Sequence, residues 1–233
     1  MNRWRRINRD RELSAESWFP PRAPIGIFSH VPKTGGTTIH KWLKSNLKMW
    51  NYRSSTRLPR KPPPDQDYVL YLGHLPLKNA VEARLFSRKM VDQIPSFGFV
   101  RNPISRALSL YHQQLTSTEE KISDDLDDFA EQLWRNRGNL SWWTPSKRLM
   151  ARPSTYWLKP RNAPHVKTVY RFEEFDFAVE HLRALYEIES HPQPRNVSRV
   201  SREKQAEPTS RFVEIVADLY REDFENFGYE LPR

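Results

Sequence analysis

The chain has 233 residues, which fits a single domain that is long enough to bury a substantial core. Lys and Arg exceed Asp and Glu by 38 to 28, and this net charge of +10 predicts an anionic ligand: nucleic acid, a phosphate-bearing cofactor, an acidic polysaccharide or an anionic membrane. The absence of cysteine excludes disulfides, thiolate metal sites and a cysteine nucleophile. There is no apolar run of about 18 residues and no apolar signal segment, so we expect a soluble, cytoplasmic protein.

Strands and helices are predicted to alternate along the chain after a basic N-terminal arm at 1–24, so that residues 25–233 form one domain. In chain order we expect a strand at 25–31, a helix around 39–47, a proline-rich loop at 57–67, a strand at 68–72, a helix at 77–89, a strand at 96–100, helices at 104–115 and 124–137, an aperiodic aromatic stretch at 142–164, a strand at 166–170, a helix at 173–186 and a last helix with apolar positions over 212–227. This order predicts an α/β domain with a central, mainly parallel sheet flanked by helices.

Polar residues follow three of the predicted strands. Lys33 follows the first strand, His74 the second and Arg101 the third. Because ligands of parallel sheets bind at the carboxyl ends of the strands, we expect these side chains to meet in one pocket.

The first of these strand ends opens a glycine loop, His-Val-Pro-Lys-Thr-Gly-Gly-Thr-Thr at 30–38, which leads into a helix. The amides and the positive dipole end of a helix start suit a phosphate, and glycines allow the backbone to close around it. The expected ligand-binding residues are Lys33, Thr34, Gly35, Gly36, Thr37 and Thr38. The lysine precedes the glycine pair, which differs from GxxxxGK[ST] and argues against a kinase; an ordinary glycine turn with a solvated lysine is the alternative reading.

The third strand end pairs Arg101 with Ser109, eight positions later. The arginine would leave the strand where the next helix begins, and the serine would lie two turns into that helix, so both could contact one phosphate. A planar guanidinium suits phosphate well, although an arginine and a serine in such positions are by themselves common.

Together, the loop and the Arg101–Ser109 pair resemble the two donor-binding motifs of sulfotransferases that use 3'-phosphoadenosine 5'-phosphosulfate (PAPS). The sequence is most similar to the carbohydrate O-sulfotransferases, which include the heparan sulfate 2-O- and 6-O-sulfotransferases, and to their bacterial relatives. The likeness extends through 169–173, 196–198 and 220–229.

The resemblance implies a metal-independent transfer of a sulfuryl group from PAPS to an acceptor hydroxyl, leaving 3'-phosphoadenosine 5'-phosphate (PAP). It implies that Lys33 stabilises the leaving phosphate and that His74, in a Gly-His pair, is the catalytic base. The sequence departs from the 2-O enzymes in having Leu72 where they have another histidine, and in lacking their membrane anchor and cysteines. No HExxH or paired-acid cluster is present, so we expect no metal.

Several alternatives stay open at this stage. The acceptor is expected to be a carbohydrate, and an anionic one would suit the charge, but a small-molecule or natural-product acceptor, sulfated on oxygen or nitrogen, also fits; Trp142, Trp143, Tyr156 and Trp157 could line either site. A basic nucleic-acid-binding module would explain the charge but not the spacing of the two motifs. His30 and His112 are expected to be structural. The oligomeric state and the sulfated position are not predicted.

Overall fold

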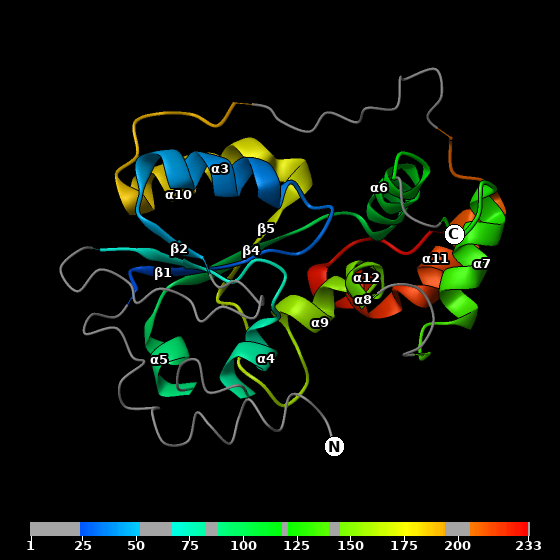
Figure 1. Ribbon diagram of the computed structural model, residues 1–233, viewed down its shortest axis with the longest axis horizontal. Coiled ribbons are helices and arrows are strands. Elements are labelled where there is room, and N and C mark those ends of the chain that lie inside the picture. The colour runs from blue at the N-terminus through cyan, green and yellow to red at the C-terminus, as the bar shows by residue number, and fades with distance from the viewer. Residues whose placement is uncertain are drawn as a thin grey trace.

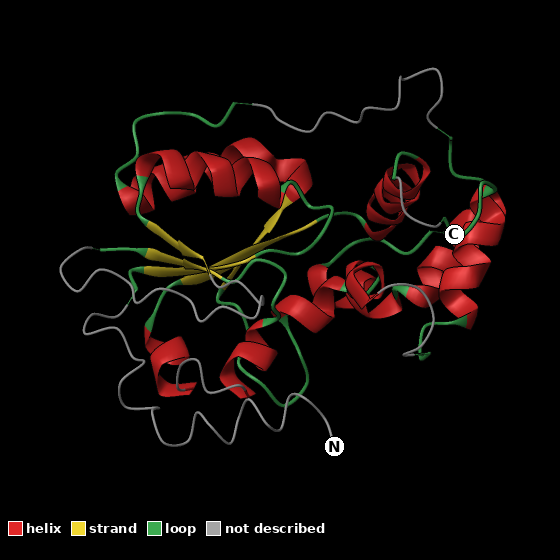
Figure 2. Ribbon diagram, viewed as in Figure 1, coloured by secondary structure: helices red, strands yellow, loops and turns green. Residues whose placement is uncertain are grey.

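A five-stranded parallel sheet organises the chain (Figures 1 and 2). The computed structural model describes residues 24–51, 67–82, 88–117, 121–139, 145–193 and 206–232. The sheet has the order β2-β3-β1-β4-β5, and each adjacent pair is parallel. Its strands are β1 (Gly26–Ser29), β2 (Met49–Asn51), β3 (Val69–Tyr71), β4 (Ser96–Val100) and β5 (Thr168–Arg171).

Helices cover both faces of this sheet, as expected for a parallel sheet. One face carries α3 (Gly36–Asn46) and α10 (Phe175–Tyr186), and α4 (Leu77–Glu82) and α5 (Arg88–Gln93) lie on the other (Figure 1). Adjacent strand residues point to opposite faces, so Phe28 packs with the first pair of helices while Ile27 packs with the second. Two apolar clusters therefore enclose the sheet.

A helical unit lies beside the carboxyl ends of the central strands. It contains α6 (Pro103–Leu115), α7 (Leu126–Arg135), α8 (Pro145–Met150), α9 (Ser154–Leu158), α11 (Ser210–Leu219) and α12 (Arg221–Phe227). Phe129 and Phe212 are fully buried where α6, α7 and α11 form a third apolar cluster. This cluster holds α6 against the end of the sheet, where the site is built.

The single α/β domain and the parallel sheet predicted from the sequence are confirmed, and four of the five strands coincide with predicted ones. The structure differs in three places. Residues 49–51 form a strand that was not predicted, the aperiodic stretch contains α8 and α9, and the last helix is two helices that meet at Tyr220. Residues 77–89 begin as α4, but 83–87 lie outside the described ranges, as do the basic arm up to residue 23 and most of the proline-rich loop. No helix in the described ranges is both long and apolar enough to cross a membrane.

Candidate active site

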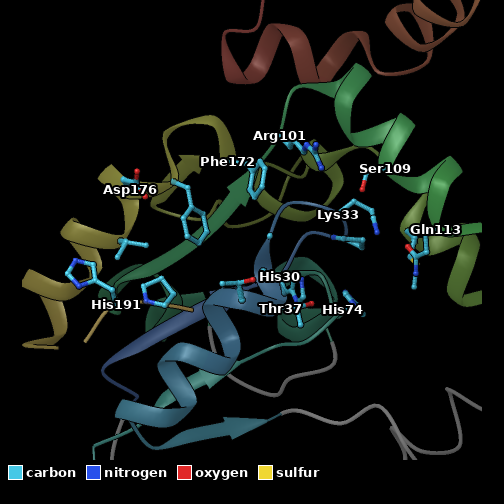
Figure 3. A pocket seen from close by; sticks show the side chains of 18 residues that line it. His30, Lys33, Thr37, His74, Arg101, Ser109, Gln113, Phe172, Asp176 and His191 are labelled. Carbon is cyan, nitrogen blue, oxygen red and sulfur yellow. The ribbon is translucent and has the colours of Figure 1, made fainter. Parts of the chain in front are cut away.

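A pocket of about 650 Å³ lies at the carboxyl ends of the strands (Figure 3). Lys33, His74 and Arg101 all line it, so the three predicted strand ends converge as expected. The other predicted residues that line the pocket are Gly35, Gly36, Thr37, Thr38 and Ser109. Thr34 does not: it is fully buried, and its hydroxyl donates to the Val31 carbonyl 2.9 Å away. The predicted contact between Thr34 and a phosphate stays a prediction.

The glycine loop turns sharply between β1 and α3. Lys33 has a φ of 68° and Gly35 a φ of 78°, both in the left-handed region, which costs a lysine some strain and a glycine none. A Cβ at Gly35 would lie 2.6 Å from the Phe172 ring, and one at Gly36 would lie 2.1 Å from the His30 ring. The glycines therefore allow close packing of two aromatic rings, in addition to the turn that the sequence predicted.

Two cations face the pocket without a carboxylate partner. Burial lowers the pKa of Lys33, and the nearby charge of Arg101 lowers it further. Burial also lowers the pKa of Arg101, and Glu173 only partly offsets this effect. Among the described residues neither cation forms an ion pair, and the buried Nε of Arg101 has no hydrogen-bond partner. A partly desolvated charge and a buried donor are both costly when unpaired, and an anionic ligand in the pocket would satisfy both.

The turn from β4 into α6 is fixed by its own polar contacts. The Asn102 side chain caps the helix by accepting from the amides of Ile104 and Ser105, at 3.0 and 3.2 Å. Glu173 accepts from the Asn102 amide at 2.8 Å and from the Tyr229 hydroxyl at 2.9 Å. These bonds hold Arg101 and Ser109 on one side of the pocket. The Arg101 guanidinium lies 4.9 Å from the centroid of the Phe172 ring.

His30, His74 and His112 have different environments. His74 is exposed to the pocket; partial desolvation lowers its pKa, and a hydrogen bond from its ring to the backbone of His30 acts in the opposite direction. Burial lowers the pKa of His30 to about 3, and its Nδ1 lies 2.6 Å from the Tyr71 hydroxyl. His112 does not line the pocket and accepts a hydrogen bond from the Ala206 amide at 3.1 Å through Nε2, a contact that is compatible with the structural role expected from the sequence.

The sequence did not predict the remaining residues that line the pocket. They include Gln113, Met150, Phe172, Phe175, Asp176, Val179, His191 and Pro192. Phe172 follows β5, so the rule that ligands bind at strand ends could have found it. The others come from positions that carry no motif. The described residues contain no group of three or more His, Asp and Glu side chains that could hold a metal ion.

Comparison with known proteins assigns the family. Residues 25–230 match the sequence model described as the Sulfotransferase family. The chain belongs to the sulfotransferase family. Its structure is similar to that of a sulfotransferase from Alicyclobacillus acidocaldarius, with a TM-score of 0.50 and 14% sequence identity over 88% of this chain and 94% of the other. At this identity the likeness shows a shared fold. No curated protein sequence matches this sulfotransferase significantly.

Proposed function

We propose that this sulfotransferase moves a sulfuryl group from PAPS to an acceptor hydroxyl, and that the acceptor is a carbohydrate. The observation that carries the proposal is the pair of cations, Lys33 and Arg101, which face one pocket at the end of a parallel sheet and have no carboxylate partner among the described residues. A donor with one phosphate at each end of a ribose needs two such cationic positions.

The residues present fit the donor at two points. Lys33, the hydroxyls of Thr37 and Thr38 and the first amides of α3 would hold the 5'-phosphosulfate. The unpaired Nε of Arg101 and the hydroxyl of Ser109 would hold the 3'-phosphate. Phe172 and Phe175, whose ring centroids lie 6.0 Å apart, add apolar surface to the lining of the pocket.

In the proposed reaction, Lys33 and His74 have different roles. The donor supplies the sulfuryl group, and its 5'-phosphate gains negative charge as the bond to sulfur breaks. Lys33 would stabilise that charge by a charge-assisted hydrogen bond in a site that is partly shielded from water. His74 would take the proton of the acceptor hydroxyl. One of its ring nitrogens bonds the His30 backbone, which leaves the other free to act as the base.

The proposal for the donor is tested by nucleotide binding. PAP should bind and raise the melting temperature, because it binds the native state. Arg101→Ala should weaken PAP binding roughly 10- to 100-fold, since a charge-assisted contact worth about 1.5 to 3 kcal/mol is lost. Arg161→Ala is a matched control: it removes the same charge from an exposed side chain that pairs with Glu222. Calorimetry measures both constants. Equal affinity for PAP and adenosine 5'-phosphate would contradict the assignment of Arg101 and Ser109.

A further inference from the structure

His30 is the first residue of the glycine loop at 30–38 and lies beside the proposed base, His74 (Figure 3). Its ring is 6% exposed and lines the pocket. It stacks on Phe28 with centroids 5.7 Å apart, and its centroid lies 4.7 Å from that of His74. These contacts place the ring at the edge of the site, in the same loop as Lys33.

One nitrogen of this ring is committed to Tyr71. The Tyr71 hydroxyl lies 2.6 Å from Nδ1, and burial raises the pKa of Tyr71 to about 12, so the hydroxyl keeps its proton at ordinary pH. Within the described part of the chain, Nδ1 is the one hydrogen-bond partner of this hydroxyl. If the hydroxyl accepted instead, its own proton would have no acceptor among the described residues. The assignment with the hydroxyl as donor and Nδ1 as acceptor places the proton of a neutral imidazole on Nε2.

The other nitrogen faces the helix start. A Cβ built on Gly36, the first residue of α3, would lie 2.1 Å from Cδ2 of His30 and 2.4 Å from its Nε2. The Nε2 edge thus lies over the residue whose amide opens the helix, beside Thr37 (Figure 3). No hydrogen bond to Nε2 is found among the residues that the structure describes, and His30, which is 6% exposed, lines the pocket.

We propose that His30 is a second catalytic histidine, which acts as a neutral donor: its Nε2–H bonds an oxygen of the 5'-phosphate bound at the start of α3 and strengthens that bond as the phosphate becomes the leaving group. The proton stays on Nε2 throughout, so no proton is transferred. This inference rests on the proposed function and adds a residue to it.

The surroundings keep the ring neutral. Desolvation is the largest cause of the low pKa of His30, and the charges of His74 and His40 lower it further. Tyr71, which contacts the ring from β3, is uncharged at ordinary pH, and His40 stacks on Tyr71 with centroids 3.9 Å apart. A neutral ring cannot act as a strong base near pH 7, and this separates the role of His30 from that of His74.

Nitrogen NMR of the wild-type protein tests the tautomer without any turnover. With ¹⁵N-labelled histidine, His30 should carry its proton on Nε2 and should not titrate between about pH 5 and 8. Adding PAP should shift the Nε2–H resonance downfield, because a phosphate oxygen then accepts from it. A proton on Nδ1, titration in this range or no response to bound PAP would overturn the inference.

A pair of variants separates the two ring nitrogens. His30→Asn keeps an acceptor near the position of Nδ1 for Tyr71 and removes the Nε2 donor, so kcat should fall roughly 10²-fold while the fold is retained. His30→Gln places an amide donor near Nε2 and should recover part of that loss.

Wild-type kcat in His30→Asn would overturn the inference. If the wild-type protein neither binds PAP nor transfers a sulfuryl group, the proposed function fails; if it does both and His30 does not respond to PAP, the inference alone fails.

Discussion

Two histidines in contact receive different chemical properties from their environments. His30 is buried, bonded to Tyr71 and pressed against Gly36, so its pKa lies at about 3. His74 is exposed to the pocket, and its pKa is lowered less completely because a bond to the His30 backbone favours the protonated form. The low pKa of His30 makes its ring too weak a base to take a proton near neutral pH. This difference supports the proposal that His74, and not His30, is the base.

Substitution of His74 should lower kcat strongly and leave the affinity for PAP nearly unchanged. Neutral imidazole is the active form and its pKa is lowered from 6.5, so kcat should hold from neutral pH down to a value below 6.5 and then fall as the ring is protonated. His74→Ala should lower kcat by roughly 10² or more, because a general base contributes about 10² to 10⁴-fold. The measurements are pH–rate profiles and PAP binding by calorimetry.

The comparison within one variant is decisive for the base. If His74→Ala loses PAP affinity in step with kcat, the residue supports the donor pocket and is not the base. Full activity would exclude it from the mechanism. His165→Ala is the control, because that side chain is exposed and does not line the pocket.

At the scale of elements, a buried arginine joins two helices of the helical unit to the glycine loop. Arg106, on α6, donates to the carbonyls of Pro32, Met150 and Arg152, and lies 3.9 Å from Asp223 of α12. Both charged side chains are 2% exposed. A bond to the Pro32 carbonyl acts one residue before Lys33, so this pair helps to fix the strained turn that presents the lysine.

Loss of this ion pair should destabilise the whole domain. Asp223 also accepts from the amides of Ser154 and Thr155, at 2.6 and 2.8 Å. Asp223→Ala therefore leaves a buried guanidinium without its counter-charge and two amides without their acceptor, and the free energy of unfolding should fall by about 3 to 5 kcal/mol. Asp124→Ala, at a 76% exposed carboxylate paired with Lys121, should cost less than about 1 kcal/mol. Urea denaturation compares them; equal losses would contradict the account of Asp223.

The fold was predictable wherever an element was long enough to show its period. The buried strands and α3, α6, α7 and α10 carry clear apolar patterns, and their alternation specifies a parallel sheet. β2 has three residues and α9 has five, which is too short for a period to appear. The break at Tyr220 leaves the apolar face of the last helix in phase, because Phe212, Phe224 and Phe227 are buried on both sides of it.

The candidate site was predictable where a motif and a strand end coincided. This rule brought Lys33, His74 and Arg101 to one pocket, together with Ser109 from the helix that follows. It could not reveal the bond between His30 and Tyr71, because that contact joins residues 41 positions apart. Such a contact depends on the register between β1 and β3, which pairs Phe28 with Tyr71 and is not visible in the sequence.

For the molecule as a whole, the net positive charge is larger than the binding of one nucleotide requires. The net charge is +10, whereas Lys33 and Arg101 are the pocket cations assigned to the donor. The remaining surplus is available to attract an anionic acceptor over a distance, and this attraction supports an acidic carbohydrate in preference to a small neutral alcohol. Long-range attraction of this kind is sensitive to salt, and that gives the test.

Turnover on an anionic polysaccharide should fall as salt is added. Screening shortens the reach of surface charge from about 30 Å at 0.01 M to about 8 Å at 0.15 M ionic strength, so kcat/KM for the polysaccharide should fall on the order of tenfold over this range. The matched control is an uncharged aromatic alcohol as acceptor, assayed in the same salt series with saturating PAPS, because any effect of salt on donor binding then appears equally in both.

If only the uncharged acceptor is sulfated, and its kcat/KM does not respond to salt, the acceptor is a small molecule and the surplus charge does not serve acceptor capture. If the polysaccharide is sulfated with no response to salt, short-range contacts in the pocket select it, and the surface charge plays no part in its capture.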